Sequence, residues 1–390
     1  MAVASRLDTG LAFTNVLLPT LAKGVIVRRS GVTALAEKVQ ADALAVATVK
    51  RFRARYGPEP LRLRVTGRSI ALVLDASDAA RLLADSPEPF RLDTVEKRAA
   101  LDHFQPHGVL ISSGEERAAR RRFNERVLHP DKIDAEGIVR DEVDLLLRHA
   151  RSTGALTWDA FARAWWRAAR RIVLGSGARD DHEVTDLLRQ LRGNANWAYL
   201  HPKRKRLRER FEARLREHVE RGEAGSIAGL GDPDEVVGQA PHWLFAFDAA
   251  GIVTMRALAI GGEGHAGIWE SARLWPTTPV ILRESTEPTD WHGTWLPAGT
   301  TFIVFAPYFH RDRDRLPYAD EYAPRIWPLP AEPGIVPFSG GPGACPGRDL
   351  VLVAGGTALE VLRPHLEVPV LRAPLPATLN HFGLSFVTRK

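Results

Sequence analysis

The stretch that decides the fold of this 390-residue chain is Phe338-Ser339-Gly340-Gly341-Pro342-Gly343-Ala344-Cys345-Pro346-Gly347, which holds its only cysteine. Glycine and proline fill most of these positions, so the backbone can bend sharply and lie close against a flat group. Apolar residues recur at helical spacing over residues 350–361, which predicts a helix directly after the stretch. Cys345 therefore precedes a helix N-terminus, where Pro346 suits the first helical position and the helix dipole favours a thiolate.

A thiolate in a glycine-lined turn is a nucleophile or a metal ligand. A nucleophile would need a histidine base brought up by the fold, and that alternative stays open. A zinc site would want further cysteines or clustered histidines, and the chain has no second cysteine. It also lacks the C-x-x-C-H pattern of covalent haem attachment. A haem iron held by one cysteinate remains, and its plain alternative is a buried free cysteine.

The composition is that of an ordinary globular protein, with 45% hydrophobic and 26% charged residues. A single cysteine permits no internal disulfide, which fits a reducing cytoplasm, and no signal-peptide pattern is evident. The apolar segment 11–27 is too short and too interrupted to span a bilayer. We therefore expect a soluble, cytoplasmic protein without a transmembrane anchor, which touches a lipid-like substrate or a membrane at most through that segment.

Two basic runs, at residues 117–126 and 201–216, raise the question of nucleic-acid binding in a chain of net charge +6. The second run carries Glu209 and Glu212 among its arginines, which is typical of a solvated helix face. No nucleic-acid-binding motif accompanies the charge. The sequence therefore favours no nucleic acid, and the first run is the better candidate for docking an acidic protein partner.

The order of patterns along the chain predicts one mainly helical domain over residues 1–390 with small β-sheets. Alternating residues suggest a hairpin at 61–74, and strands with turns are expected at 291–305. A helix over residues 236–260 is apolar nearly all round, which marks a helix crossing the interior. Gly251 in its middle costs about 1 kcal/mol relative to alanine, so something should require it. Thr254 lies on the same face, and its plain interpretation is a hydroxyl bonded back to a carbonyl in a closely packed helix.

The spacing Phe338-x-x-Gly341-x-x-x-Cys345-x-Gly347 resembles the signature of the cytochrome P450 family, whose haem iron is held by a cysteine thiolate. The resemblance implies a P450-like fold with haem b (iron protoporphyrin IX) between the long central helix and the helix after the cysteine. It implies Cys345 as the axial ligand, Phe338 covering the sulfur, and Gly341 and Gly347 admitting the porphyrin. Gly343 departs from the usual arginine or histidine.

The central helix is similar to the family's Ala/Gly-Gly-x-Asp/Glu-Thr oxygen-binding motif at residues 250–254. The resemblance implies that Gly251 and Thr254 shape the oxygen site. Val253 stands where the family has its acid, so the usual acid–alcohol proton relay is incomplete. Asp248 is offset from Thr254 by about 240° around the helix, which makes it a poor substitute for that acid. A water chain on Thr254, or peroxide as the oxidant, would take the place of the relay.

Glu270 and Arg273 resemble the family's Glu-x-x-Arg pair, which braces the cysteine loop with a third basic residue from a proline-rich segment. Arg325, in a segment similar to that one, falls one place early. Arg121 and Arg283 match positions that the family uses to bind haem propionates, since an arginine fork suits carboxylates. Arg117 replaces the more usual histidine or tryptophan in the same helix.

Together these features imply a soluble, bacterial-type haem-thiolate monooxygenase that inserts one atom of dioxygen into an apolar small molecule. Electrons are expected from a separate ferredoxin or flavodoxin with an NAD(P)H-dependent reductase, docking on arginines 120–126. The alternatives are a peroxide-driven peroxygenase and a non-enzymatic haem-binding or sensor protein. The expected pocket walls are Phe90, Phe104, Trp197, Ala246, Phe247, Ala250, Pro279, Val280 and Phe382.

Overall fold

A computed structural model of the chain describes residues 2–196, 198, 200–327, 332–368, 371 and 373–389. It divides into two compact units, the first formed by residues 1–94, 272–345 and 372–380 and the second by residues 95–271, 346–371 and 381–390. Each unit is assembled from three separate segments, so no single linker marks the division. The single catalytic domain over residues 1–390 stays a prediction.

The first unit is built on a five-stranded sheet of order β1-β2-β8-β5-β3. Its strands are β1 Leu61–Val65, β2 Arg68–Leu72, β3 Phe90–Arg91, β5 Val280–Ser285 and β8 Thr301–Phe305. The hairpin β1–β2 occupies the predicted stretch 61–74, and the small pair β6 (Thr289–Trp291) and β7 (Thr294–Leu296) precedes β8 in the other predicted stretch. β2 pairs with β8 in parallel and β5 pairs with β8 antiparallel, so segments far apart in the sequence share the centre of this sheet.

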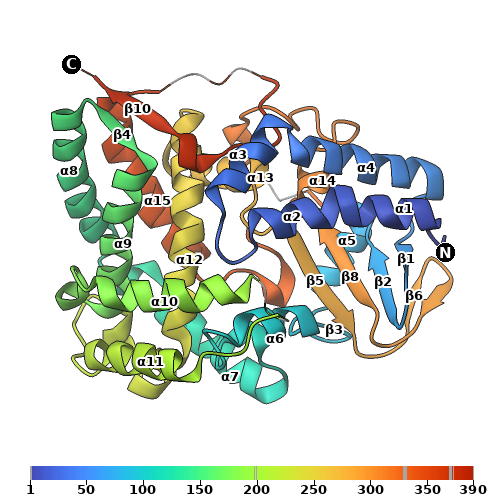
Figure 1. The fold of residues 1–390 in the computed structure, drawn as a ribbon, viewed down its shortest axis with the longest axis horizontal. Helices are drawn as coiled ribbons and strands as arrows, with labels where there is room; N and C mark the ends of the chain where they lie inside the picture. Colours follow the sequence, from blue (N-terminus) through green and yellow to red (C-terminus); the bar gives the residue numbers. More distant parts are fainter. Residues whose placement is uncertain are drawn as a thin grey trace. The chain divides into compact units, whose positions relative to one another are not determined.

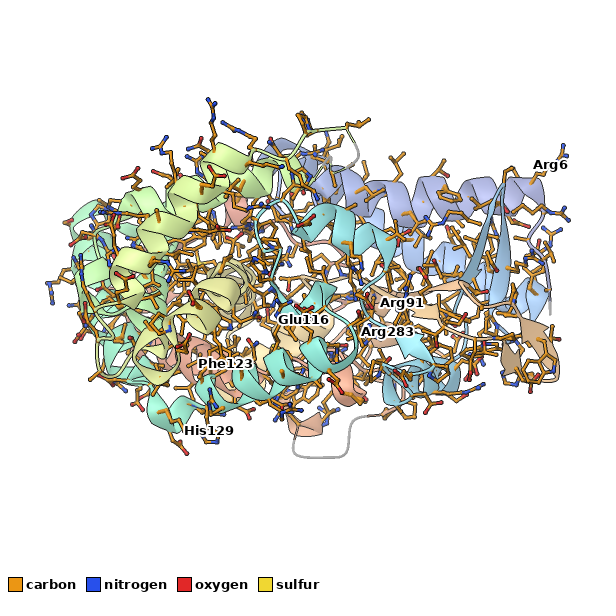
Figure 2. All side chains as sticks on the ribbon, turned by 90° about the horizontal axis from the view of Figure 1, so that it is seen from below. Arg6, Arg91, Glu116, Phe123, His129 and Arg283 are labelled. Atoms are coloured by element: carbon orange, nitrogen blue, oxygen red, sulfur yellow. The ribbon has the colours of Figure 1, made fainter. Side chains whose placement is uncertain are left out.

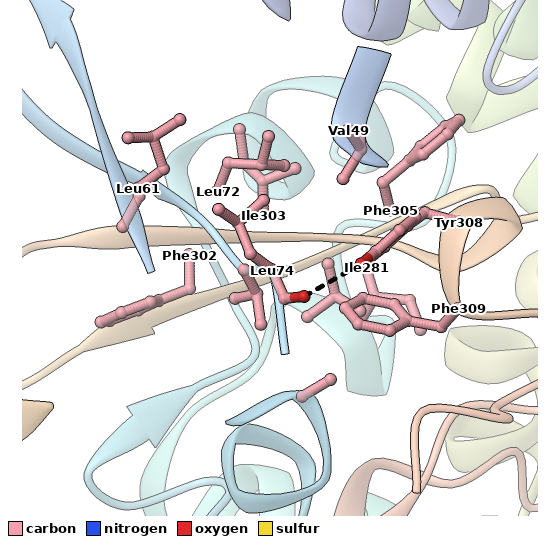
Figure 3. Packing of buried hydrophobic residues seen from close by; sticks show 14 of the residues in the cluster. Val49, Leu61, Leu72, Leu74, Ile281, Phe302, Ile303, Phe305, Tyr308 and Phe309 are labelled. Carbon is pink, nitrogen blue, oxygen red and sulfur yellow. Dashed lines mark hydrogen bonds between the residues drawn. The ribbon is translucent and has the colours of Figure 1, made fainter. Parts of the chain in front are cut away.

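The core of the first unit gathers aromatic and aliphatic side chains from both faces of this sheet (Figure 3). The ring of Phe302 lies 4.8 Å from that of Trp291 and 5.6 Å from that of Phe90. The Tyr308 hydroxyl donates to the Leu74 carbonyl at 3.3 Å, which gives this buried polar group a partner. Helices α5 (Ala76–Ala84) and α14 (Ala306–His310) follow directly on β2 and β8.

The N-terminal helices also belong to the first unit. A continuous helix runs through α1 (Arg6–Leu11), a π-helical segment (Ala12–Leu17) and α2 (Leu18–Lys23). It is followed by α3 (Ser30–Lys38) and α4 (Ala41–Tyr56), and α4 runs alongside it (Figure 1). Ser5 caps α1 by accepting from the Asp8 N–H at 3.0 Å, while the buried Asp8 carboxylate accepts from the Tyr56 hydroxyl at 2.6 Å. These bonds fix the first turn of the helix to the last turn of α4.

The second unit is mainly helical. Its helices are α6 Val95–Leu101, α7 Gly114–Val127, α8 Ala135–Thr153, α9 Trp158–Leu174, α10 His182–Ala195, α11 Lys205–Val219, α12 Pro233–Ala259 and α15 Arg348–Leu362. A three-stranded sheet joins β4 (Ala155–Thr157), β10 (Ser385–Thr388) and β9 (Leu366–Glu367) in that order. α12 fills the predicted central-helix position and packs against α9, α11 and α15 (Figure 1). α13 (Gly264–Leu274) follows α12 after a short turn.

Within the described residues, no individual helix combines the length and the apolar character needed to cross a bilayer. The pair α12 and α13 passes such a test together, by length and composition only, with a bend of 103° at the break.

Candidate functional site

The cysteine loop of the first unit folds back on itself through two backbone hydrogen bonds. The Cys345 N–H donates to the Phe338 carbonyl at 2.9 Å, and the Ala344 N–H donates to the Gly341 carbonyl at 2.9 Å. Cys345 itself is half-buried. The following helix begins at Arg348, so Pro346 lies in the turn before it and not at the first helical position that the sequence predicts.

Gly341 is required by the surface on which the loop rests. Its φ angle is +56°, in the left-handed region that glycine adopts without strain. A Cβ at this position would also collide with the carbonyl oxygen of Leu83, near the end of α5. The backbone of the loop and the end of α5 are therefore in direct contact, and any side chain at position 341 would separate them.

Arg283 lies beside the same loop and accounts for the unusual Gly343. Its side chain is 1% exposed, and its guanidinium donates to the Ser86 hydroxyl at 2.8 Å and to the Leu282 carbonyl at 3.0 Å. A Cβ at Gly343 would stand 2.6 Å from the Arg283 Nη2 atom. The guanidinium thus occupies the space of a side chain two residues before the cysteine, where the family usually has a cation.

The neighbouring strand of the sheet adds a second cation to this region. Arg91 on β3 forms an ion pair with Glu284, the residue after Arg283 on β5. Figure 2 shows the labelled Arg91 and Arg283 side chains near each other on these two strands. The ion pair between Arg91 and Glu284 therefore lies beside Arg283, whose guanidinium is next to the loop.

Arg273, at the end of α13, is the centre of a buried brace in the first unit. Its guanidinium donates to the carbonyls of His310 at 3.2 Å, Ala319 at 3.0 Å and Glu321 at 2.7 Å, and its side chain is 0% exposed. It also lies over the Tyr318 ring, 5.4 Å from the centroid. A buried charge persists only when its donors are satisfied, and here backbone carbonyls satisfy them.

His310 extends this brace to the cysteine loop. Its Nδ1 lies 2.9 Å from the Arg273 carbonyl, and its Nε2 accepts from the Val336 N–H at 2.9 Å. Burial lowers the pKa of the imidazole to about 3, so the ring is neutral at physiological pH. Because Nε2 accepts, the proton lies on Nδ1, and the neutral ring ties the end of α13 to the residue two before Phe338.

The predicted third member of the brace is not in this network. Arg325 lies in a short 3-10 turn, and its side chain is exposed. The carbonyl oxygens around Arg273 and the imidazole of His310 do the bracing instead. Glu270 is buried with 0% exposure, as a bracing acid would be. Sequence reasoning missed His310, whose only signal is a histidine directly after the aromatic pair Tyr308-Phe309.

In the second unit, α7 carries the predicted propionate ligand Arg121. Its Nε donates to Glu125 at 2.7 Å, one turn further along the helix. Arg117, one turn earlier, is the more buried of the two, with 8% exposure. The two arginines share one face of α7.

Gly251 of α12 is required by a tryptophan from α9. The Trp165 indole donates to the Phe247 carbonyl at 2.7 Å, and a Cβ at Gly251 would stand 2.7 Å from the same ring. The glycine therefore makes room for close packing between α9 and α12. This differs from the predicted role in an oxygen groove.

Thr254 faces a different neighbour. Its hydroxyl donates to the Ala250 carbonyl at 2.9 Å. A Cβ at Gly355 on α15 would stand 2.9 Å from the Thr254 hydroxyl oxygen. The side chain is 1% exposed. These contacts agree with the plain interpretation of Thr254 as a back-bonded hydroxyl in a packed helix, and its catalytic role stays a prediction.

After its exposed first turn, α12 is buried except along one face that remains accessible. The partly exposed positions on this accessible face are Gly238, His242, Phe245, Ala246, Asp248, Ala249 and Arg256. Most of them recur at intervals of three and four residues, which places them along one side of the helix. At 100° per residue, Thr254 points about 140° away from Ala249. Gly251 and Thr254 therefore lie on the packed side of α12.

The accessible face carries two polar groups that the sequence analysis did not select. Asp248 forms an ion pair with Arg192 of α10, whose side chain is 3% exposed and lies 4.8 Å from the Phe245 ring centroid. Among the described residues, the Nδ1 atom of His242 has no hydrogen-bond partner. Burial lowers the pKa of His242 to about 4. A charged residue such as Asp248 in an apolar helix indicates that a partner of opposite charge is nearby. The sequence alone does not identify Arg192 as that partner.

The family profile described as cytochrome P450 matches residues 265–361 of the chain. CYP175A1 from Thermus thermophilus has the same fold, with a TM-score of 0.65 at 19% identity over 92% of this chain and 97% of that one. Cyanobacterial CYP120A1 with retinoic acid bound has a TM-score of 0.69 at 15% identity, over 87% of this chain and 93% of that one. The chain therefore has the cytochrome P450 fold, and its residues 265–361 match the cytochrome P450 profile. The predicted mainly helical P450 fold with small sheets is confirmed.

Curated P450 relatives match a shorter part of the chain. Probable cytochrome P450 312a1 of Drosophila melanogaster is 28% identical over 128 residues, which are 32% of this chain and 24% of that protein. Cytochrome P450 705A1 of Arabidopsis thaliana is 32% identical over 107 residues, 25% of this chain and 21% of that protein. These matches span about a quarter or less of the relatives' length. Members of the P450 family bind haem and are generally monooxygenases.

The P450 pocket walls predicted from the sequence fall into two groups. Phe90, Phe104, Phe247, Ala250 and Pro279 are buried, while Ala246, Val280 and Phe382 are partly exposed, and Trp197 lies outside the described residues. Phe90 packs against Trp291 and Phe302 in the core of the first unit, and Phe247 packs against Trp165. Both pack among other aromatic side chains, and the role of these residues as pocket walls stays a prediction.

A hollow of about 810 Å³ lies in the second unit between α8, α15 and the start of α13. Its lining includes Glu136, His265, Thr357, Glu360 and Arg363. None of the predicted site residues lines it, so it contributes nothing to the site described above.

Replacing Arg273 with alanine should lower the free energy of unfolding by about 3 kcal/mol or more, because three buried carbonyls lose their donor. Urea denaturation followed by circular dichroism measures the change. Arg273→Lys, which keeps the charge but reaches fewer carbonyls, should lose less. Arg325→Ala is the control: its exposed side chain predicts a change within about 0.5 kcal/mol. Equal losses in Arg273→Ala and Arg325→Ala would contradict this placement of the brace.

Proposed function

We propose that the chain is a haem-thiolate monooxygenase that inserts one oxygen atom from dioxygen into an apolar organic substrate. The observation that carries the proposal is the folded-back turn of Cys345, held by the Phe338 carbonyl and flanked by the buried Arg283 guanidinium. A cysteine sulfur and a carboxylate-binding cation beside one glycine turn are the donor set that haem requires.

The residues present fit haem b. Cys345 would supply the thiolate ligand and Phe338 its cover, while Gly347 would leave the porphyrin face unobstructed. Gly341, which was expected to admit the porphyrin, instead lets the loop contact the end of α5. Arg283 would bind a propionate in the place of the cation that Gly343 lacks, and Arg121 or its neighbour Arg117 would bind the other. Bound haem would supply the activation of oxygen, assisted by electron donation from the thiolate.

The accessible face of α12 suggests which protein groups manage protons. We assign this role to Asp248, whose carboxylate is held by Arg192 and is 25% exposed. Rotation of the carboxylate away from Arg192 would let one oxygen carry a proton from solvent to the oxygen site. Ala246 and Ala249 lie on the same face and have small side chains.

Within the second unit, the partly exposed apolar side chains Ala246 and Phe382 would contact the substrate. His242 is neutral at physiological pH and would offer a hydrogen bond to a polar group of an otherwise apolar substrate. In an apolar pocket, one or two polar groups set the orientation of the ligand and contribute specificity.

Asp248→Asn should lower the rate of substrate oxidation by about a hundredfold or more, because a general acid is lost while the side-chain shape is kept. Thr254→Val should stay within about twofold of the wild-type rate, since the Thr254 hydroxyl is bonded within its own helix. Both rates are measured at equal haem content with a ligand chosen by its shift of the ferric spectrum. The reverse order of the two effects would restore the assignment of Thr254 made from the sequence.

A peroxide-driven peroxygenase is the second candidate. The specific observation in its favour is that the described accessible face of α12 carries no hydroxyl side chain. Product formation with hydrogen peroxide and no reductase would favour it. Strict dependence on NAD(P)H and redox proteins would favour the monooxygenase, and haem binding without product under either condition would indicate a non-enzymatic haem protein.

The thiolate assignment has its own test. The purified holoprotein should be coloured, and its reduced carbon monoxide complex should show the strongly red-shifted band of thiolate ligation. Cys345→Ala should lose that band. A protein that stays colourless after reconstitution with haem, or an unchanged spectrum in Cys345→Ala, would overturn the proposed function.

We further propose that electrons come from a separate ferredoxin or flavodoxin, served by an NAD(P)H-dependent reductase, that docks on α7. Among the described residues, Arg120 pairs with Glu116, Arg121 with Glu125 and Arg126 with Glu235. Arg122 is exposed, and no ion pair in the described part of the chain engages it. It is the arginine of this helix most available to an acidic partner.

Arg122→Glu should slow reduction by the acidic partner about tenfold at low salt while substrate affinity is unchanged, because a rim charge acts mainly on association. Arg163→Glu, at an exposed arginine of α9, is the matched control and should reduce at the wild-type rate. Stopped-flow reduction at increasing ionic strength measures both. Equal rates for Arg122→Glu and wild type at low salt would reject this docking face.

A further inference from the structure

The N-terminal helix of the first unit presents an apolar face to solvent. Across residues 6–23 the exposed positions are Arg6, Leu7, Gly10, Phe13, Thr14, Leu18 and Leu21. They recur at intervals of three and four residues, so they form one side of the helix. Leu7 is 71% exposed, Leu18 56% and Leu21 54%. A surface helix normally turns its charged side outward and its apolar side inward, and this one exposes apolar residues on its outer side too.

Exposed apolar side chains are concentrated in this part of the chain. Of thirteen large hydrophobic side chains exposed among the described residues, eight lie within the first 44. Leu35, Val39 and Leu44, from the next two helices and the turn between them, continue the series. α2 packs against α3, and the π-helical segment packs against α4. A concentration of this kind marks an interaction surface, while scattered single residues would need no explanation.

The net charge of the chain lies in the same segment. Residues 1–56 carry nine Lys and Arg against three Asp and Glu, so they hold the whole net charge of +6. The three acids turn inward, where Asp8 is buried against Tyr56, Asp42 pairs with Lys23 at 2.6 Å, and Glu37 accepts from the Asn380 N–H.

The outward charges of this segment are therefore positive. Arg6, Lys38 and Arg51 are exposed at its surface. Figure 2 shows the labelled Arg6 side chain projecting away from the ribbon. An apolar face with a basic rim is complementary to a surface that is apolar below and negatively charged at its edge.

We infer that this N-terminal apolar face binds the surface of an anionic lipid bilayer. Leu7, Phe13, Leu18 and Leu21 would enter the boundary between headgroups and acyl chains, and the basic rim would contact the anionic headgroups. The helix is about 27 Å long, and it would lie in the plane of the membrane and not cross it. A protein partner would be expected to meet more hydrogen-bonding groups at the centre of the face, where Thr14 is the single polar side chain.

The inference is independent of haem and of catalysis. If the proposed function also holds, binding at the membrane would place the enzyme where apolar substrates dissolve. The test therefore uses vesicle binding as its readout, so that its failure does not bear on the haem-thiolate chemistry.

Co-sedimentation of the holoprotein with vesicles tests the proposal. The protein should pellet with vesicles of phosphatidylcholine and phosphatidylglycerol, less with phosphatidylcholine alone, and less on the anionic vesicles as salt rises. Leu18→Glu and Leu21→Glu should each lower the partition coefficient about tenfold or more, because a carboxylate replaces a leucine that enters the membrane. Lys38→Gln should lower it about fivefold on anionic vesicles only.

Leu145→Glu is the matched control, since Leu145 of α8 is an exposed leucine, 41% accessible, outside the face. It should bind vesicles as the wild type does. Wild-type protein that stays in the supernatant with both vesicles, or Leu18→Glu that pellets like Leu145→Glu, would overturn the proposal. A dimer seen by sedimentation velocity without vesicles, and abolished by Leu18→Glu, would assign the face to a second copy of the chain and reject the lipid.

Discussion

The hydrogen bonds around Arg273 and His310 are the constraint on which the cysteine loop depends. They join the end of α13 to α14, to the residues after it and to Val336, which are far apart in the sequence. A buried guanidinium is costly unless its donors find acceptors. Here the acceptors are backbone carbonyls, so the cation fixes the path of the chain itself and not just a neighbouring side chain. The neutral imidazole completes the network without adding a second buried charge.

Three glycines show how the structure uses missing side chains. Gly341 lets the cysteine loop touch the end of α5, Gly343 leaves room for the Arg283 guanidinium, and Gly251 leaves room for the Trp165 indole. In each case the group that an added Cβ would collide with belongs to a segment distant in sequence. Gly343 departs from the pattern of the family because the cation comes from β5 instead of from the loop.

The two sides of α12 make different contacts. The packed side carries Gly251 and Thr254, which fit α9 and α15 closely. The accessible side carries Asp248, whose charge is compensated by Arg192 of α10. A helix that is apolar nearly all round gives little information about which side is packed, because apolar residues suit both a core and a ligand cavity. The oxygen-site role of the motif at residues 250–254 therefore rests on its resemblance and stays a prediction.

The sequence by itself determined the class of fold, the cysteine turn and the positions of the long helix and the β1–β2 hairpin. These are local features: a glycine-rich turn, a run of apolar residues and an alternating pattern depend on neighbours in the chain. The resemblance to the P450 family also selected Arg273 and Arg283, which the residue pattern alone does not distinguish. What only the tertiary structure decided is which groups meet: His310 with Val336, Arg192 with Asp248, and Trp165 with Phe247. Such contacts join residues from about 26 to 82 positions apart. The pattern of residues within one segment does not show which residue of another segment will contact it.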